Sequence, residues 1–389
     1  MQYLNLEEIN YIDEKFSKIS KQFGFKKIFP KSVSSMEASI DYYKNTKSSL
    51  VKIIDFEGEV NILHEDPTIS LFDSKILNEK IYYLTNTFSW DKSIENLKGG
   101  VENFCEESVI ADAEIIIIAN ELLKNLNLDD FTIEIGHTHF IEKLLNSDGI
   151  SRSEKIRLNN AIHNKNIQKI EKILNELDIS NENKNALIVL SKLFGDYESI
   201  LKNATELNIS ELKPIIDYLT KLKKILLIYK IDIKKLKIDL SLTNKYSYYD
   251  GMIFNSYIRD YGKKILQGGR YNNNDKQGVG FSFNILNLIG VIKMTNYNLA
   301  KNDYTVITNS SNNEKALYLA TALRENGLNV NLMENELEYD VIKNINSAFI
   351  LSIQNDLVNI ISKNTNEVYK KSYNEFIEGI NSTKLESIH

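Results

Sequence analysis

Strand-forming segments lie on both sides of a long stretch that has only helical periodicity. From about residue 140 to 235, apolar residues recur at helical spacing, and we expect no strand there. Before this stretch, short strands, hairpins and helices are mixed, without the regular alternation of a parallel sheet. We therefore predict an antiparallel α+β core, residues 1–140 and 236–298, interrupted by an all-α insertion, residues 141–235.

The expected elements of the core follow from local patterns. Residues 8–24 have apolar residues at helical spacing and end in Gly24, which can terminate a helix. A strand that carries Pro30 follows, and proline in a strand indicates a sheet edge or an interface position. Residues 49–66 predict a β-hairpin that turns at Gly58. A helix is expected over 110–126, and further strands over 80–90, 131–137, 237–242, 252–258, 264–269 and 278–285.

A different pattern begins near residue 304. Strands and helices alternate over residues 304–389, and Gly327 is placed to end one of the helices. We expect a small α/β domain here, with a largely parallel sheet.

The composition argues against several classes of protein. The chain has 42% hydrophobic and 26% charged residues, which is typical of globular proteins with a sizeable core. Its net charge of −6 lacks the excess of positive charge by which nucleic-acid-binding proteins usually neutralise phosphates, which argues against nucleic acid as a main ligand but leaves a local basic patch open. The single cysteine, Cys105, excludes an internal disulfide framework, and we expect an inert thiol.

No segment predicts export or a membrane. The first residues, MQYLNLEEIN, lack a basic segment followed by an apolar one, so we expect no secretory signal. The most apolar run, residues 113–123, is shorter than the roughly 20 residues that cross a bilayer. We therefore expect a cytoplasmic protein with no membrane partner.

An ordered set of motifs carries a family resemblance. The motifs are GGVE (99–102), ADAE (111–114), the segment 238–258, QGGRY (267–271) and GVGFSF (278–283). In this order they resemble the catalytic core of histidyl-tRNA synthetases, which belong to class II. The resemblance implies the class II antiparallel sheet with helices, and a dimer built through the first helix and strand. It also implies that residues 304–389 are similar to the family's anticodon-binding domain.

The chain departs from these motifs where the synthetases have arginines. Formation of an adenylate builds up negative charge on phosphate, which preorganised arginines stabilise. The second motif has Ser89 in place of its arginine, and the third ends in Leu286-Asn287 in place of Glu-Arg. The histidine loop has Thr243-Asn244-Lys245 in place of Val-Arg-Gly. We therefore predict a chain that makes no adenylate and has no catalysis of its own.

Part of the amino-acid pocket is retained. The resemblance places Tyr248 and Tyr249 at the tyrosines that contact histidine, and Glu102 at the acidic residue that holds the imidazole. It places Asp66 and Thr68 in the loop that contacts the α-amino group. Carboxylates suit an ammonium and an imidazole N–H, and tyrosine offers both a ring face and a hydroxyl. We predict that these five residues bind histidine as an effector.

We expect the segment QGGRY, residues 267–271, to form the wall of this pocket. Gly268 and Gly269 let the backbone either turn tightly or approach a ligand closely, and Arg270 and Tyr271 follow them. Lys98 stands where the family has a glutamine. The alternative interpretation is that the pocket residues are ordinary core and rim residues of a decayed site.

A second resemblance is more specific. A synthetase-like chain without catalytic arginines, and with Gly136-His137 after a strand, resembles the regulatory subunits of ATP phosphoribosyltransferase. This implies a short-form catalytic subunit as partner in a hetero-oligomer, a role in the first step of histidine biosynthesis, and feedback inhibition by histidine. His137 and His139 are spaced as a metal pair on one strand face, but no third ligand is evident. We expect no metal and no cofactor.

Two alternatives from other classes stay open. One is a divergent histidyl-tRNA synthetase in which lysines, with Lys98 and Lys245 as candidates, replace the arginines. The other is a synthetase-like sensor of tRNA or histidine. The basic residues of 304–389 are scattered and offset by acidic ones, unlike the cluster that an anticodon requires. We expect a structural or partner-facing domain there.

Overall fold

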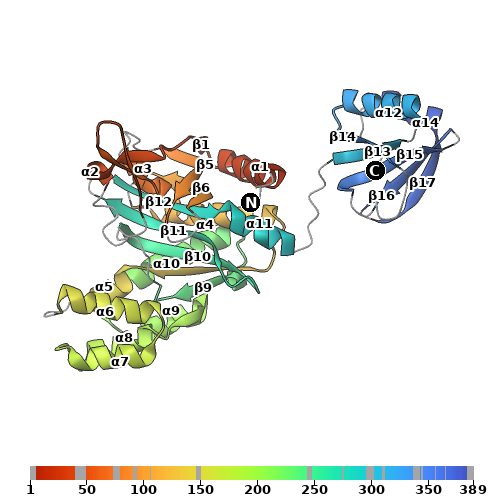
Figure 1. The fold of residues 1–389 in the computed structure, drawn as a ribbon. Helices are drawn as coiled ribbons and strands as arrows, with labels where there is room; N and C mark the ends of the chain where they lie inside the picture. The colour runs from red at the N-terminus through yellow and green to blue at the C-terminus, as the bar shows by residue number, and fades with distance from the viewer. Residues whose placement is uncertain are drawn as a thin grey trace. The chain divides into compact units, whose positions relative to one another are not determined.

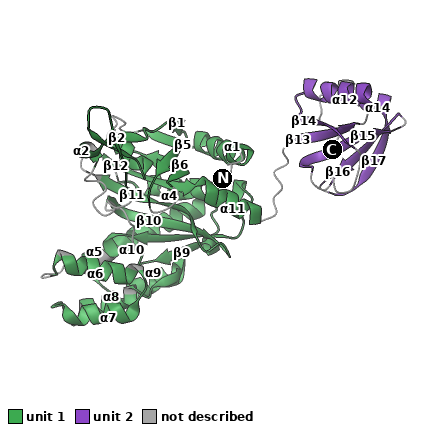
Figure 2. Cartoon of the chain, viewed as in Figure 1, with its two compact units in different colours: residues 1–296 green, residues 297–389 purple. Residues whose placement is uncertain are grey.

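The computed structural model divides the chain into two compact units, residues 1–296 and residues 297–389 (Figure 2). Each unit has a hydrophobic core of its own. Among the described residues, no helix is both long and apolar enough to cross a membrane. The structure describes residues 6–39, 50–72, 79–90, 94–105, 107–145, 150–242, 248–273, 276–294, 302–308, 312–335, 342, 345–354, 356–363 and 365–382.

A large sheet forms the centre of unit 1 (Figure 1). Within the described ranges it has nine strands in the order β1-β5-β6-β12-β11-β10-β7-β9-β8. β1 pairs with β5 and β7 with β9 in parallel, and every other neighbouring pair is antiparallel. The predicted α+β fold with an antiparallel sheet is confirmed. The strands are β1 (Lys26–Lys27), β5 (Lys80–Phe88), β6 (Glu95–Asn103), β7 (Phe131–His137), β8 (Phe194–Asp196), β9 (Leu236–Asp239), β10 (Tyr249–Ile258), β11 (Lys264–Asn273) and β12 (Lys276–Asn284).

Helix α4 (Val109–Asn125) packs against one face of this sheet. Ser108 begins the helix, because its side chain accepts a hydrogen bond from the Ala111 N–H. The following run Ile115, Ile116, Ile117 and Ile118 is buried on all sides. A helix that is apolar all round must be covered all round. The sheet, α1 (Leu6–Gln22) and α10 (Lys213–Ile228) provide that cover, and α11 (Ile285–Met294) packs against α1.

A smaller sheet and a short helix pack on the opposite face of the large sheet. The small sheet has the order β2-β4-β3, and β3 and β4 form the predicted hairpin, with Gly58 at φ +86° in its turn. Its residue Ile62 and residues of α3 share a buried cluster with Tyr83 and Tyr271 of the large sheet. The elements are β2 (Val33–Ser35), α2 (Met36–Ser39), β3 (Val51–Ile54), β4 (Val60–Leu63) and α3 (Pro67–Phe72).

Helices fill most of the segment between β7 and β9, as expected. The expectation that it holds no strand was wrong, because β8 pairs antiparallel with β9 and forms an edge of the large sheet. A strand of three residues is too short for a period-two pattern to reveal it. The helices are α5 (His139–Leu145), α6 (Arg152–His163), α7 (Ile167–Glu176), α8 (Asn181–Leu190), α9 (Tyr197–Glu206) and α10, with 3₁₀ turns Ser210–Leu212 and Ile233–Lys235.

The first strand needs a smaller correction. β1 lies at the other edge of the large sheet, as predicted, but it ends at Lys27, before Pro30. Proline has no N–H to donate to a neighbouring strand, so it does not continue the ladder.

Unit 2 has a five-stranded sheet in its described residues, with the order β14-β13-β15-β16-β17. β13 pairs in parallel with β14 and β15, but β15–β16 and β16–β17 are antiparallel. The predicted largely parallel sheet is therefore wrong. Only residues 355–356 separate β15 from β16, and a parallel connection needs about a dozen residues or more. The elements are β13 (Asn302–Thr308), α12 (Asn313–Glu325), β14 (Val330–Glu334), β15 (Ser347–Gln354), β16 (Leu357–Ser362), β17 (Val368–Ser372) and α14 (Tyr373–Ser382).

Candidate binding site

A small hollow lies on the face of the large sheet that carries α3. Its volume of about 10 Å³ holds roughly one water molecule. The structure brings five of the predicted site residues together here, namely Asp66, Thr68, Glu102, Tyr249 and Tyr271. The remaining lining residues are Gly280, Phe281 and Ser282.

Strand register explains why Glu102 has room in the hollow. Glu102 on β6 lies directly opposite Gly280 on β12. A Cβ atom on Gly280 would lie 2.0 Å from Glu102 Oε2, so a side chain at this position would displace the carboxyl group. Gly278, on the same side of β12, makes the same allowance for the hydroxyl of Tyr271, 2.5 Å from its ideal Cβ position.

Hydrogen bonds tie the two carboxyl groups of the hollow together. The Thr68 hydroxyl donates to Glu102 Oε1 at 2.6 Å, and the Thr68 N–H donates to Asp66 Oδ1 at 3.1 Å. Asp66 Oδ2 also accepts a hydrogen bond from the hydroxyl of Tyr248. Tyr248 stands behind the lining and packs on Tyr249, with ring centroids 4.8 Å apart. All five residues of the predicted effector site are therefore contiguous.

The electrostatics of the hollow centre on Glu102. Burial, together with the nearby charge of Asp66, raises the pKa of Glu102 from 4.5 to about 8. The carboxyl group is therefore mostly protonated at neutral pH. Within the described residues, neither Glu102 Oε2 nor Tyr271 Oη makes a well-formed hydrogen bond. A ligand that brings an N–H donor or a positive charge would stabilise the ionised form of this carboxyl group and so lower its pKa.

Arg270 does not line the hollow. Neighbouring residues of a strand face opposite sides of a sheet, so Arg270 and Tyr271 diverge. The Arg270 guanidinium lies against Asp112 of α4, with contacts of 2.7 and 2.9 Å, and the side chains of both residues are buried. The hydroxyl of Tyr218 on α10 donates to the same carboxylate. This buried group connects β11 to two helices.

The two predicted wall glycines lie at tight contacts between strands. A Cβ atom on Gly268 would come within 2.3 Å of the Gly280 carbonyl oxygen, and one on Gly269 within 2.5 Å of the Met252 carbonyl oxygen. Both glycines therefore allow β11 to lie close to its neighbouring strands rather than to a ligand, and neither lines the hollow.

A larger groove of about 620 Å³ adjoins the hollow, and Ser282 lines both. Ser89, Leu286 and Asn287, which replace three motif residues of the synthetases, all line this groove. The Thr243-Asn244-Lys245 segment lies outside the described residues. The other groove residues are Glu65, Thr87, Asn96, Lys98, Lys263, Lys264, Ile265, Leu266, Gln267, Phe283 and Asn284.

Sequence reasoning missed Tyr83 and Gly280. Tyr83 on β5 is fully buried and its hydroxyl donates to Glu102 Oε1 at 3.3 Å. Gly100 makes room for it, since a Cβ atom there would lie 2.5 Å from the Tyr83 hydroxyl. The available signal was the pair Gly278 and Gly280 in GVGFSF, because glycines at alternate strand positions leave one face open to bulky neighbours.

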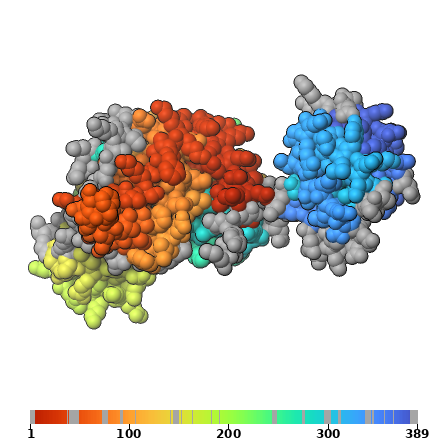
Figure 3. All heavy atoms as spheres, turned by 45° about the horizontal axis from the view of Figure 1, so that its top comes forward, coloured from red at the N-terminus to blue at the C-terminus, as the bar shows by residue number. Residues whose placement is uncertain are grey.

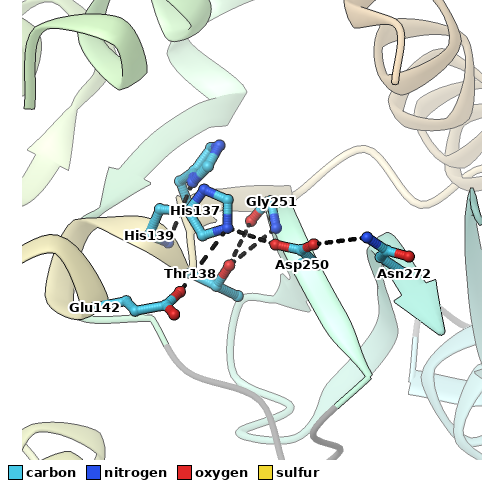
Figure 4. A network of polar contacts seen from close by, with 7 residues as sticks. All are labelled: His137, Thr138, His139, Glu142, Asp250, Gly251 and Asn272. Atoms are coloured by element: carbon cyan, nitrogen blue, oxygen red, sulfur yellow. Dashed lines mark hydrogen bonds and ion pairs between the residues drawn. The ribbon is translucent and has the colours of Figure 1, made fainter. Parts of the chain in front are cut away.

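A second polar cluster lies beside the hollow, where α5 begins (Figure 4). His139 Nε2 contacts Asp250 Oδ1 at 2.5 Å, and the Asn272 side chain donates to Asp250 Oδ2 at 3.2 Å. Burial and the neighbouring His139 lower the pKa of His137 to about 3, so this imidazole is neutral. In the described ranges, no group of three or more metal-ligating side chains is found.

Comparisons with known proteins give a consistent family. A family model described as histidyl-tRNA synthetase matches residues 5–288. A curated ATP phosphoribosyltransferase regulatory subunit from Clostridium kluyveri is 31% identical over 307 residues, covering 72% of this chain and 78% of that protein. One from Clostridium novyi is 26% identical and covers 98% and 95%. A solved structure from Bacillus halodurans, described as an ATP phosphoribosyltransferase regulatory subunit/histidyl-tRNA synthetase, has a similar fold, with a TM-score of 0.75 at 22% identity over 90% of this chain and 96% of that chain.

Proposed function

The chain belongs to the family of ATP phosphoribosyltransferase regulatory subunits with a histidyl-tRNA synthetase-like fold, and from this membership we propose how it acts in histidine biosynthesis. It is a regulatory subunit without catalysis of its own. It binds a short-form catalytic subunit, enables the first step of the pathway, and makes that step sensitive to inhibition by histidine.

One observation carries this proposal. The hollow keeps two carboxyl groups, a threonine and two tyrosines in mutual contact, whereas the adjoining groove has Ser89, Leu286 and Asn287 at the motif positions. The hollow therefore offers the groups that recognise an amine and an imidazole. The described lining of the groove has no arginine, and so none of the guanidinium groups that stabilise negative charge on a reacting phosphate. A subunit that senses an amino acid must bind it but need not catalyse a reaction of it.

Histidine binding must change the shape of the hollow. We expect the imidazole N–H to donate to Glu102 and the α-ammonium to contact Asp66, as carboxyl groups bind such donors. A space for roughly one water molecule does not hold an amino acid, so residues that line the hollow must move when histidine enters. If only one arrangement of the complex permits this movement, histidine favours that arrangement, which is the requirement for allostery.

Self-association is part of the proposal. Phe29 and Phe56 are 79% and 97% exposed, and Ile54 of the hairpin is 72% exposed. They belong to the N-terminal segments, coloured red to orange, that form much of the visible surface of unit 1 in Figure 3. Burial of such apolar side chains would favour a dimer within the hetero-oligomer. We expect the complex to work in the cytoplasm, where no membrane or nucleic-acid partner is needed.

The first test measures the phosphoribosyltransferase activity of a short-form catalytic subunit with and without this chain. Each measurement is made with and without histidine. We expect activation by the chain and suppression of the activated rate by histidine. Activation that histidine does not affect would keep the partnership and refute the effector site. Absence of both activation and complex formation would refute the proposed function, and tRNA binding would then be measured by gel shift.

A variant of the hollow tests the site itself. Glu102→Ala should leave activation intact and remove most of the histidine inhibition, because the imidazole loses its acceptor. The matched control is Glu176→Ala, which removes an exposed carboxylate from α7 and should change neither property. Unchanged inhibition in Glu102→Ala would show that histidine binds elsewhere. A parallel assay should find no histidine-dependent exchange between pyrophosphate and ATP, which a divergent synthetase would catalyse.

A further inference from the structure

We propose that the outer face of α10, together with the two residues that follow the helix, is a docking surface for the catalytic subunit. This inference rests on the proposed partnership and names a surface that would mediate it. The residues of this α10 patch, all of them exposed, are Lys221, Lys224, Leu227, Ile228, Tyr229 and Lys230.

The segment that contains the patch is basic, whereas the chain as a whole is acidic. Residues 213–237 have eight lysines and two aspartates, and so carry a net charge of +6 in a chain of net charge −6. Part of this charge is neutralised within the chain. Lys223 pairs with Glu198 of α9, and Lys237 pairs with Asp196 of β8, each at 2.5 Å.

The lysines of the patch are not neutralised in this way. Among the residues that the structure describes, Lys221, Lys224 and Lys230 have no carboxylate within the distance of an ion pair. Their positive charges are therefore available to a partner. A cluster of like charges on one face raises the rate at which an oppositely charged partner associates.

Helical geometry places the patch away from the core. Lys221, Lys224 and Ile228 follow the spacing i, i+3 and i+7, so they share one face of α10. The fully buried Leu222 and Leu226 lie on the opposite face, which packs into the core. The outer face would be expected to be polar throughout, but it becomes apolar near the end of the helix.

The apolar part of the patch indicates a protein partner. Leu227, Ile228 and Tyr229 are 46%, 76% and 53% exposed, and in the chain they lie between Lys224 and Lys230. An apolar centre with charged residues at its rim is the usual arrangement of a protein–protein interface. Contacts with the phosphates of a nucleic acid would use the lysines but would leave these three side chains in water.

A second copy of this chain does not fit the patch. In a two-fold symmetric contact, the same surface meets itself, so the lysines of one copy would face those of the other. Like charges placed opposite each other disfavour such a contact. The catalytic subunit is free of this restriction, and we expect the face that it presents to the patch to be acidic at its rim.

The same helix connects the patch to the effector site. The Tyr218 hydroxyl on α10 donates to the Asp112 carboxylate, which pairs with Arg270 of β11. Arg270 directly precedes Tyr271, which lines the hollow. A partner bound at the patch would therefore contact a helix that is tied to a strand of the effector site. Regulation by histidine requires a physical connection of this kind between the two sites.

The first test measures binding of the short-form catalytic subunit to the full chain by biolayer interferometry over a series of salt concentrations. The double variant Lys221→Gln/Lys224→Gln should associate about 3- to 10-fold more slowly than wild type at low salt, and its association rate should depend less on salt. The matched control is Lys169→Gln/Lys172→Gln, which removes two exposed lysines at the same spacing from α7. The control should associate like wild type.

A second variant tests the apolar centre. Ile228→Ser should weaken binding about 10-fold, mainly through faster dissociation, because an exposed apolar side chain would no longer be buried on binding. The matched control is Ile156→Ser, which changes an isoleucine of α6 that is 53% exposed, and it should bind like wild type. Circular dichroism and thermal unfolding of the free chains would show that all four variants are folded.

The outcomes separate the patch from the partnership. Folded patch variants that bind the catalytic subunit with wild-type rates would overturn the docking surface and leave the partnership in place. Patch variants that keep this binding but lose binding of tRNA would assign the surface to a nucleic acid instead. A wild-type chain that does not bind the catalytic subunit at any salt concentration would refute the proposed function, and the docking surface with it.

Discussion

The buried ion pair between Arg270 and Asp112 provides a quantitative test of the structure. Arg270→Met removes the guanidinium and keeps a side chain of comparable length. It leaves the Asp112 carboxylate, which is fully buried, with the Tyr218 hydroxyl as a neutral donor. Removing one partner of a buried ion pair costs about 3–5 kcal/mol, because the remaining charge is no longer compensated.

The cost should depend on pH. Burial raises the pKa of Asp112, and Arg270 opposes that effect. Without Arg270 the pKa of Asp112 rises further, so the folded variant holds a proton that the unfolded chain has released. Stability of the variant therefore falls as pH rises. The difference in unfolding free energy between wild type and Arg270→Met should be larger at pH 8 than at pH 5.

Urea unfolding followed by the fluorescence of Trp90 measures this difference. Trp90 is the single tryptophan of the chain, and it lies in unit 1, so it reports on the unit that contains the ion pair. Arg157→Met is the matched control, because Arg157 pairs with Glu176 at the surface and its loss should cost at most about 1 kcal/mol. A loss in Arg270→Met no larger than this control, or one independent of pH, would refute the reasoning. Histidine affinity should be unchanged in folded Arg270→Met, since Arg270 lies outside the hollow.

Three further outcomes follow from the same contacts. Gly280→Ala should abolish histidine inhibition, because the added Cβ atom would lie 2.0 Å from Glu102 Oε2. Gly379→Ala should leave inhibition unchanged, because no heavy atom outside its own helix backbone and chain neighbours lies within 4 Å of the position of its Cβ atom. Because the pKa of Glu102 is raised from 4.5 to about 8, wild-type stability should fall as pH rises through this range, and Glu102→Gln should remove that slope in urea unfolding. Tyr218→Phe should lower the unfolding free energy by about 1–3 kcal/mol, measured in the same way, because Asp112 loses a buried donor.

The fold of unit 1 was largely predictable because most of its helices and strands are long and are bounded by turn residues. The hairpin at Gly58 and the strands β5, β7 and β12 have strong patterns bounded by turn residues. β8 was not predictable, because three residues carry no period and its pairing with β9 depends on tertiary structure. In unit 2, strand positions were correct but strand direction was not, although the short link 355–356 contained the necessary information.

The site was predictable only as far as motif positions determine it. Asp66, Thr68 and Glu102 could be placed in one pocket by resemblance, and the structure brings them into contact. The direction of Arg270 depends on strand alternation, and QGGRY alone does not show which of its residues faces the hollow. Tyr83 belongs to no motif, and its contact with Glu102 depends on the pairing of β5 with β6.

The burial of Glu102 bears on whether the hollow is a functional site or a decayed one. Burial of a carboxyl group that is incompletely hydrogen-bonded costs free energy, and a chain that needed only packing at this position would gain from a neutral or apolar side chain. Here the carboxyl group is buried, its pKa is raised to about 8, and Gly280 is the residue that leaves space for it. A buried group that lowers stability in this way is expected at a functional site, where a bound ligand offsets the cost of its burial. The groove shows the opposite pattern at Ser89, Leu286 and Asn287, where uncharged residues replace charged residues of the synthetase motifs. The two regions together therefore favour an effector site that binds an amino acid without activating it.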